Sequence, residues 1–155
     1  DPSDRVAWVG PSMSARSSIT ARQMETWAHA QAIADELGIE RSEDDRIRNI
    51  VVLGVNTFGW SFMVRGMEVP EGPPALHLTS PSGESWEYGN PESDQVIRGM
   101  AHEFAQVVTQ TRNIADTRLV CEGDIAELWM RNAQCFAGAA TEPPAPGVRR
   151  TKSSA

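Results

Sequence analysis

The sequence predicts an α+β protein, in which a pair of helices is followed by a small α+β domain. Residues 14–37 and 43–65 place apolar side chains at helical spacing. The segment "EVPEGPPA" at 68–75 then interrupts this pattern with three prolines and a glycine. Beyond it the apolar residues alternate, as they do in strands. These changes divide the chain into a helical region at 1–68, an α+β domain at 69–138 and a tail at 139–155.

The first helix is predicted to begin after a Ser or Thr cap near Ser14 and to end before Gly38, a residue suited to the left-handed position after a last turn. Its apolar side chains form two neighbouring stripes, and we expect both to be buried. The first stripe contains Met24, Trp27, Ala28 and Gln31, and the second contains Ile19, Ala30, Ile33 and Leu37.

The second helix is predicted over residues 43–65. Ser42 is a suitable cap, and the acidic residues that follow it favour a helix N-terminus. The middle of this segment is almost entirely apolar, so we expect it to be buried between other elements. The short loop between the two helices predicts an antiparallel pair.

The second half of the chain alternates between strand and helix patterns. A hairpin is predicted from strands at 76–78 and 86–88 around the turn "SPSG", with a possible third strand at 96–97. Helices are expected at 100–111 and 124–138, with a further strand at 117–123 between them. The tail has three prolines and no apolar pattern, so we expect it to be mobile and disordered.

Composition excludes several classes of function. The 155-residue chain has a net charge of -7, which argues against nucleic acid as a partner. No apolar run approaches the roughly 18 residues needed to cross a bilayer, so we expect no membrane partner. The two cysteines lack a Cys/His cluster, which favours a cytoplasmic protein with inert, buried thiols. Asp1 is not an initiator Met, and we expect the chain to be part of a longer protein.

Glu25 and His29 are the sharpest candidates for chemistry. A separation of four residues places them on one face of the helix, one turn apart. A carboxylate oxygen and an imidazole nitrogen are suitable ligands for zinc, but a catalytic zinc usually takes three protein ligands. The alternative is a surface pair that hydrogen-bonds internally or to solvent.

Three other polar residues could contribute to such a site. His77 on a predicted strand and His102 on a predicted helix are candidates for a third ligand; each could equally be an isolated, hydrogen-bonded histidine. Arg22 lies one turn before Glu25 and could hold an anionic substrate near a metal, or form a surface ion pair. The sequence contains no GxSxG, P-loop or GxGxxG motif.

The segment "VGPSMSARSSITARQMETWAHAQAIADELGI" resembles the third-helix region of the DinB-like, mycothiol-dependent maleylpyruvate isomerase superfamily, in particular an actinobacterial metal-binding branch. The resemblance implies a four-helix bundle that holds a divalent metal, with zinc the leading candidate. One histidine ligand would come from the second helix of the bundle, and Glu25 and His29 would be the pair on the third. Residues 99–138 resemble the same branch's C-terminal domain, which is similar to sterol-carrier folds.

The resemblance implies a metal-dependent isomerase or thiol transferase that uses mycothiol and acts on a small electrophilic substrate, with Arg22 orienting a substrate carboxylate. The first two bundle helices would precede Asp1. We therefore expect the apolar helix face to be covered by that missing N-terminal segment or by a second copy in a homodimer. Ala32 and Asn113 stand where the branch commonly has Asp and His. The alternative function is a non-catalytic module that binds a small molecule, a lipid or a partner protein.

Overall fold

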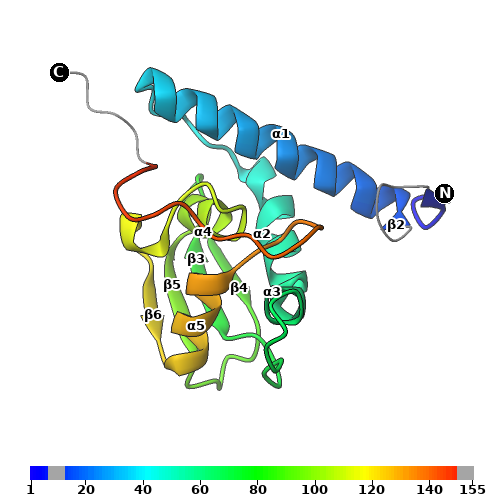
Figure 1. The fold of residues 1–155 in the computed structure, drawn as a ribbon, viewed down its shortest axis with the longest axis vertical. Coiled ribbons are helices and arrows are strands. Elements are labelled where there is room, and N and C mark those ends of the chain that lie inside the picture. The colour runs from blue at the N-terminus through cyan, green and yellow to red at the C-terminus, as the bar shows by residue number, and fades with distance from the viewer. Residues whose placement is uncertain (7–12, 150–155) are drawn as a thin grey trace.

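A computed structural model describes residues 1–6 and 13–149. The N-terminal part contains β1 (Arg5–Val6), β2 (Met13–Ser14), α1 (Ala15–Leu37), the 3-10 helix η1 (Asp45–Ile47), α2 (Arg48–Asn56) and α3 (Phe58–Met63). The rest contains β3 (Ala75–Thr79), β4 (Ser85–Tyr88), β5 (Val96–Met100), α4 (Ala101–Val108), the 3-10 helix η2 (Ile114–Asp116), β6 (Val120–Glu122) and α5 (Asp124–Asn132) (Figure 1). Within these residues, no helix is both long and apolar enough to cross a membrane.

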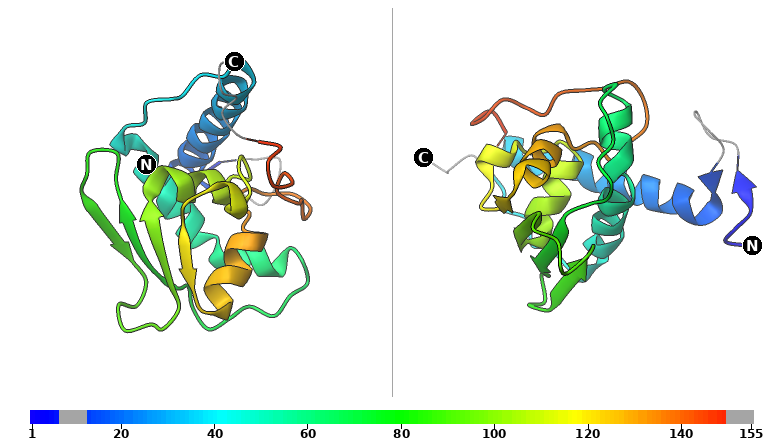
Figure 2. Two further views of the ribbon diagram at one scale, coloured as in Figure 1. Left: turned by 90° about the vertical axis from the view of Figure 1, so that its left-hand side faces the viewer. Right: turned by 90° about the horizontal axis from the view of Figure 1, so that it is seen from below.

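The four-stranded sheet has the order β4-β3-β5-β6. Strands β3 and β4 form the expected hairpin, with Leu78 opposite Trp86. Strand β5 pairs in parallel with β3 and antiparallel with β6. Helices lie against one face of this sheet (Figure 2). The α+β prediction is confirmed, as are the strands expected after residue 75.

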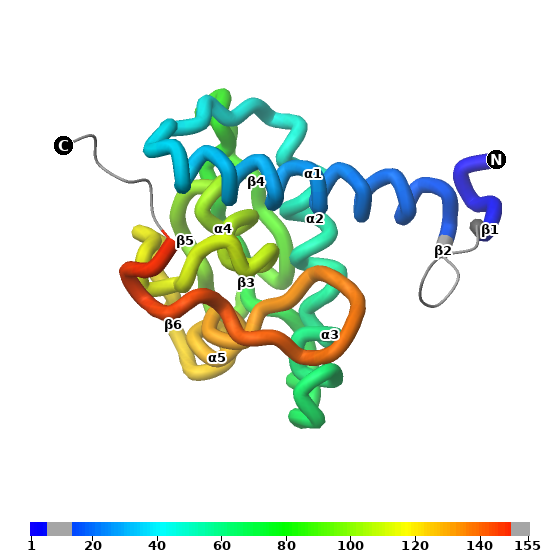
Figure 3. Tube along the Cα trace, turned by 45° about the horizontal axis from the view of Figure 1, so that its top comes forward, coloured from blue at the N-terminus to red at the C-terminus, as the bar shows by residue number. Residues whose placement is uncertain are grey.

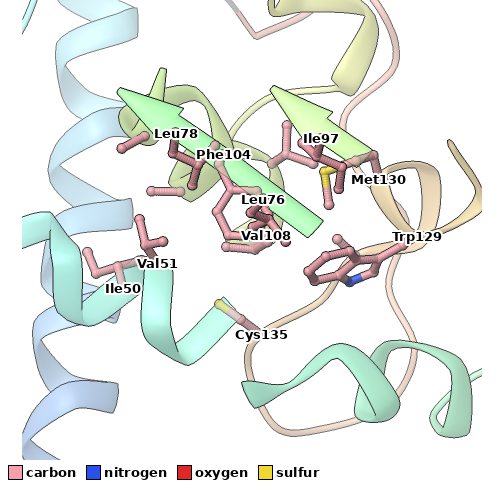
Figure 4. Packing of buried hydrophobic residues seen from close by; sticks show 14 of the residues in the cluster. Ile50, Val51, Leu76, Leu78, Ile97, Phe104, Val108, Trp129, Met130 and Cys135 are labelled. Atoms are coloured by element: carbon pink, nitrogen blue, oxygen red, sulfur yellow. The ribbon is translucent and has the colours of Figure 1, made fainter. Parts of the chain in front are cut away.

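One hydrophobic core joins the sheet to the helices on both sides of residue 68. Strand alternation directs the side chains of Leu76, Leu78 and Ile97 into this core, where α2, α4 and α5 meet them (Figure 4). The Trp129 ring contacts Phe58 and Phe104 edge to face. Its centroid lies 5.0 Å from that of the Phe58 ring and 5.6 Å from that of the Phe104 ring. The helices α2 and α3 are therefore packed as part of the α+β domain, with no separate core of their own.

The close contact between α2 and α4 depends on Gly54. A Cβ atom at this position would lie 2.9 Å from a Val108 methyl carbon and 3.0 Å from the Phe104 ring. Since well-packed interiors resist even one added methyl group, glycine allows α2 to approach α4 closely.

Helix α1 has the termini that the sequence predicts, but only one of its two apolar stripes is buried. The side chain of Ser14 accepts a hydrogen bond from the backbone N–H of Ser17, and Gly38 adopts a left-handed conformation with φ 68°. Met24 and Trp27 on the first stripe are buried, whereas the second stripe is largely exposed. The prediction of two buried stripes is wrong for the described chain, because no described element covers the outer side of α1.

The second predicted helix is divided into η1, α2 and α3. The segment after Gly38 runs back along α1, where Arg41 donates to the Trp27 carbonyl and Gln23 donates to the Arg46 carbonyl. Regular α-helix therefore begins only at Arg48, and α2 and α3 run across α1 instead of back along it (Figures 1 and 3). The expected antiparallel pair is wrong for this reason.

A break at Thr57 separates α2 from α3. The Thr57 hydroxyl donates to the carbonyls of Leu53 and Gly54, at 2.8 and 3.1 Å. Threonine hydroxyls that bond the preceding turn in this way commonly bend helices. The break directs α3 toward α5.

The chain after α5 passes over the helices as a segment without helix or strand (Figure 3). Helix α5 ends at Asn132, earlier than the expected residue 138, and the buried Gln134 amide donates to the Ala139 carbonyl. Asn113 donates to the Pro144 carbonyl, and the Gly147 N–H donates to the Asp116 carboxylate. Residues 139–149 thus make specific contacts with the body, and the expected mobility of the tail stays a prediction. Residues 150–155 lie outside the described part.

Candidate metal-binding site

Arg22, Glu25 and His29 lie on the outer side of α1, and all three are exposed. Met24 and Trp27, which are buried, project from the opposite side of the same helix. Among the described residues, none forms a hydrogen bond or ion pair with the side chains of Arg22, Glu25 or His29. The carboxylate and the imidazole are therefore accessible to an external ligand or metal.

Glu25 and His29 are the two candidate ligands that α1 supplies within one helical turn. They contain no group of three or more His, Cys, Asp or Glu side chains that could hold a metal ion. His77 lies on β3, where its Nδ1 atom is 3.4 Å from a Glu87 carboxylate oxygen, and His102 lies on α4. The structure does not bring either histidine to Glu25 and His29, so neither completes the site.

Large apolar side chains lie on the same outer side as the candidate ligands. The exposed fractions are 69% for Ile19, 62% for Ile33 and 66% for Leu37. Single exposed apolar residues are ordinary on protein surfaces, but here three follow one side of one helix. The outer side of α1 thus combines exposed apolar side chains with the two candidate ligands.

The inner side of α1 carries a buried ion pair that the sequence did not reveal. Both carboxylate oxygens of Asp35 accept hydrogen bonds from the Arg112 guanidinium, which ties the end of α1 to the segment after α4. Gln31 also donates to Asp35 at 2.8 Å, and the Arg149 guanidinium lies 3.6 Å away. Burial alone would raise the pKa of Asp35, but the hydrogen bonds from Arg112 and Gln31 and the two positive charges hold that pKa below its ordinary value.

A second attachment of α1 is centred on Trp27. Its indole N–H donates to Glu43 at 2.9 Å, and the Arg41 guanidinium lies 5.4 Å from the ring centroid. A hollow of about 380 Å³ opens beside these residues, lined by Gln23, Thr26, Trp27, Ala30, Arg41, Ser42, Glu43, Asp44, Arg46 and Ile47. It lies on the flank of α1 and does not include Glu25 or His29.

The two cysteines are free and do not have the environment of reactive thiols. Burial raises the pKa of Cys121 to about 11, aided by the charge of Glu127 and partly opposed by Arg131. Burial raises the pKa of Cys135 to about 12. Thiols that stay protonated at neutral pH are poor nucleophiles. A smaller hollow, of about 210 Å³, lies beside Cys121.

Asn113, one of the two departures from the expected branch, has a structural role. Its side-chain oxygen accepts from the Ala115 N–H and caps η2, while its side-chain nitrogen donates to the Pro144 carbonyl. Ala32 is half-buried on α1. Neither residue adds an acid or base beside Glu25 and His29.

The buried Asp35–Arg112 pair could not be located from the sequence. Gln31 and Asp35 are four residues apart, which indicates one helix face. The partner of Asp35 lies 77 residues further along the chain, and nothing in the local pattern identifies it. The only available signal was two polar residues near a stripe that was otherwise predicted to be buried.

Two curated relatives, uncharacterized proteins from two strains of Mycobacterium tuberculosis, are each 41% identical to this chain over 143 residues. The similarity covers 92% of the chain and 54% of each relative, so the chain spans about half the length of the curated relatives it matches. Their source agrees with the actinobacterial origin expected from the sequence. No family model and no solved structure matches the chain.

Proposed function

We propose that the outer side of α1 binds a divalent metal, with zinc as the leading candidate. We further propose that the protein is an enzyme that depends on this metal and on a thiol cofactor. The activity proposed is that of an isomerase or thiol transferase of the mycothiol-dependent type, acting on a small electrophilic substrate. Glu25 and His29 are the proposed metal ligands, and Arg22 is the proposed substrate-orienting residue.

The observation that carries this proposal is the exposed, unpartnered state of Glu25 and His29 one helical turn apart. An imidazole that no neighbouring carboxylate or carbonyl engages can direct a ring nitrogen to a metal. The carboxylate, similarly unengaged, keeps both oxygens available. The donor types fit zinc, although two ligands fall short of the usual three.

The remaining ligand must come from outside the described residues, which contain no completing group. Two sources are compatible with the apolar outer side of α1: a segment of the full-length protein beyond this chain, or a second copy of the chain. Either would also cover Ile19, Ile33 and Leu37.

The proposed chemistry assigns separate roles to the three residues. A bound divalent metal supplies Lewis acidity, which lowers the pKa of a coordinated thiol or water and provides a nucleophile at neutral pH. Glu25 and His29 hold this centre, and the Arg22 guanidinium binds a carboxylate of the substrate in the correct orientation. The two cysteines take no part, because their raised pKa values keep them protonated.

Elemental analysis after dialysis tests the metal site directly. In the full-length protein, the unmodified sequence should retain zinc, whereas His29→Ala and Glu25→Gln should lose it while keeping the same circular dichroism spectrum. His77→Ala is the matched control, because His77 is a half-exposed histidine on the sheet, away from the proposed site. Equal zinc retention by the unmodified full-length protein and its His29→Ala variant would contradict the proposal.

A non-catalytic binding module is the second candidate function. The observation in its favour is the hollow beside Cys121, which Ile114 and Leu119 line with apolar side chains. Its volume of about 210 Å³ suits only a small ligand, below the roughly 300–1,000 Å³ of typical ligand pockets. Between the sheet and the helices, Phe104 and Trp129 fill the space that a lipid chain would need. Binding of apolar ligands, without any metal uptake, would favour this candidate.

A further inference from the structure

The hollow beside Trp27 has two walls that come from one stretch of the chain. Helix α1 forms one wall, and the segment that returns along it, residues 41–47, forms the other (Figure 3). The volume of this hollow, about 380 Å³, lies within the roughly 300–1,000 Å³ of typical ligand pockets. Unlike the smaller hollow beside Cys121, it is therefore large enough for a small organic molecule.

Several polar side chains around this hollow already satisfy one another. The Gln23 amide donates to the Arg46 carbonyl and accepts from the Asn49 amide. The Arg46 guanidinium donates to both carboxylate oxygens of Asp44, and the Arg46 backbone N–H donates to one of them. These bonds hold the walls in place, so Gln23, Asp44 and Arg46 have a structural role.

Arg41 and Glu43, in contrast, retain unused bonding capacity. Among the described residues, the Arg41 side chain makes one hydrogen bond, from Nη1 to the Trp27 carbonyl. Oε2 of Glu43 accepts from the Trp27 indole N–H, whereas Oε1 lies 3.8 Å from Nε of Arg41, which is too far for a hydrogen bond. A guanidinium has five N–H donors. The described part of the hollow therefore presents unused donors of Arg41 beside an unused acceptor oxygen of Glu43.

Both of these charged side chains are largely shielded from water. The exposed fraction is 23% for the Arg41 side chain and 11% for the Glu43 side chain. Water competes less for polar groups in such places, so a bond from either group to a ligand is stronger than the same bond on an open surface. The pair can therefore contribute to affinity as well as to orientation.

The other lining residues supply an apolar surface and two hydroxyl groups. Trp27 and Ile47 are buried, and Ala30 is half-buried. Thr26 and Ser42 line the hollow from opposite walls, and both are exposed. A ligand can thus place hydrocarbon against the apolar residues while its polar end meets the two charged side chains.

We propose that this hollow binds a small α-amino acid, whose carboxylate pairs with Arg41 and whose ammonium group pairs with Glu43. An amino acid carries both charges on one carbon, which matches a guanidinium and a carboxylate that lie 3.8 Å apart without a hydrogen bond. The ligand replaces this loose contact with charge-assisted hydrogen bonds to both groups. The inference goes beyond the proposed function and does not depend on it, because Glu25 and His29 do not line the hollow.

The two opposite charges select a ligand that also carries both. A simple carboxylate would pair with Arg41 but would bring its negative charge close to Glu43. A simple amine would pair with Glu43 but would meet the positive charge of Arg41. Only a molecule with both groups satisfies the two side chains together, so we expect either single-charge analogue to bind more weakly.

Trp27 provides a signal for binding in this hollow. Its indole N–H donates to Glu43, and the Arg41 guanidinium lies 5.4 Å from the centroid of its ring. A ligand that bonds to either charged group changes the surroundings of this N–H. The indole N–H signal in an NMR spectrum should therefore move on binding, and Trp27→Phe identifies it among the five tryptophans.

NMR titration with three matched probes tests the inference. The probes are L-leucine, 4-methylpentanoate, which lacks the ammonium group, and 3-methylbutylamine, which lacks the carboxylate. L-leucine should move the Trp27 signal to saturation. Each analogue should bind at least about tenfold more weakly, because it loses one charge-assisted bond and leaves one protein charge unsatisfied.

Glu43→Gln tests the charge while keeping an oxygen that can accept from Trp27. It should weaken L-leucine binding by about tenfold. Glu122→Gln is the matched control, because Glu122 belongs to a similar Arg–Glu pair, with Arg98, on the sheet. It should bind L-leucine like the unmodified chain.

Ala30→Leu tests the hollow without altering a charge. The larger side chain fills space against the apolar surface and should prevent L-leucine binding. Ala32→Leu is the matched control, because Ala32 is also half-buried on α1 but does not line the hollow. Urea unfolding of each variant shows whether the fold is kept.

Three results would overturn the inference. A Trp27 signal that L-leucine does not move would exclude an amino acid from the hollow. Equal affinity for L-leucine and 4-methylpentanoate would exclude the role of Glu43. Unchanged L-leucine affinity in both Glu43→Gln and Ala30→Leu would locate binding elsewhere. None of these results bears on zinc uptake by Glu25 and His29, so the proposed function is tested separately.

Discussion

The two sides of α1 differ in how their polar groups are engaged. On the inner side, Asp35 is buried, binds Arg112 through both oxygens and also accepts from Gln31. On the outer side, Glu25 and His29 have no partner among the described residues. The inner side therefore holds α1 to the rest of the protein. The outer side leaves a carboxylate and an imidazole available to bind a ligand.

This difference separates stability from function on one helix. Substitutions on the inner side should unfold or loosen the protein, since they leave buried polar groups without partners. Substitutions on the outer side should leave folding unchanged and alter only binding. The predictions below test this separation, beginning with the largest expected effect.

Asp35→Ala should lower the free energy of unfolding by about 3–5 kcal/mol, because it leaves the buried Arg112 without its partner. Urea unfolding measures this change. Glu122→Ala is the control, since it removes an acidic partner from the exposed Arg98 pair. Its expected cost is below about 1 kcal/mol. Equal costs for the two variants would contradict the structural role of the inner side.

Acid should remove the contribution of Asp35. Its folded-state pKa is lowered from 3.8, so its ionised form stabilises the protein fully above that value. The contribution falls as the pH drops through the lower, folded-state pKa. The stability difference between the unmodified chain and Asp35→Asn should therefore shrink from about pH 5 toward pH 2. A difference that stays constant over this range would contradict the assigned ion pair.

Trp27→Phe should cost about 2 kcal/mol, because it removes the donor to the Glu43 carboxylate. Trp60→Phe is the matched control, since that indole N–H donates to the neutral Phe136 carbonyl. Hydrogen bonds to charged groups are worth more, so the control should cost only about 1 kcal/mol. A reversed order in thermal or urea unfolding would show that the Glu43 contact does not hold α1.

Changes on the outer side should have the smallest effect on folding. Ile19→Ser and His29→Ala should each alter the free energy of unfolding by less than about 0.5 kcal/mol in a chelator. Urea unfolding of both variants checks this expectation. A loss above about 2 kcal/mol for either one would mean that the outer side is part of the folded core of this chain.

Local patterns predicted much of the fold. The caps at Ser14 and Gly38 lie where the sequence places them, because capping depends on neighbouring residues alone. The alternation around Leu76 and Trp86 likewise predicted the hairpin. Patterns of this kind are decided within a few residues, and the structure confirms them.

Features that depend on contacts between residues far apart in the chain could not be predicted from the sequence. The segment after Gly38 follows α1 because Arg41 and Arg46 meet groups on that helix, and no helical signal reveals such contacts. The second stripe of α1 was expected to be buried, but it is largely exposed. The spacing of apolar residues along a helix does not show whether another element packs on them. The spacing identified Glu25 and His29 as candidate metal ligands. No pattern in the sequence identifies a third ligand.

The central claim is that His29 binds metal on the outer side of α1. Zinc titration followed by NMR of the histidine ring signals tests it most directly, because the chain has only three histidines. We predict that the ring signals of His29 change and saturate, while those of His77 and His102 stay in place. Changes confined to His77 or His102, or no change in any ring, would contradict the claim.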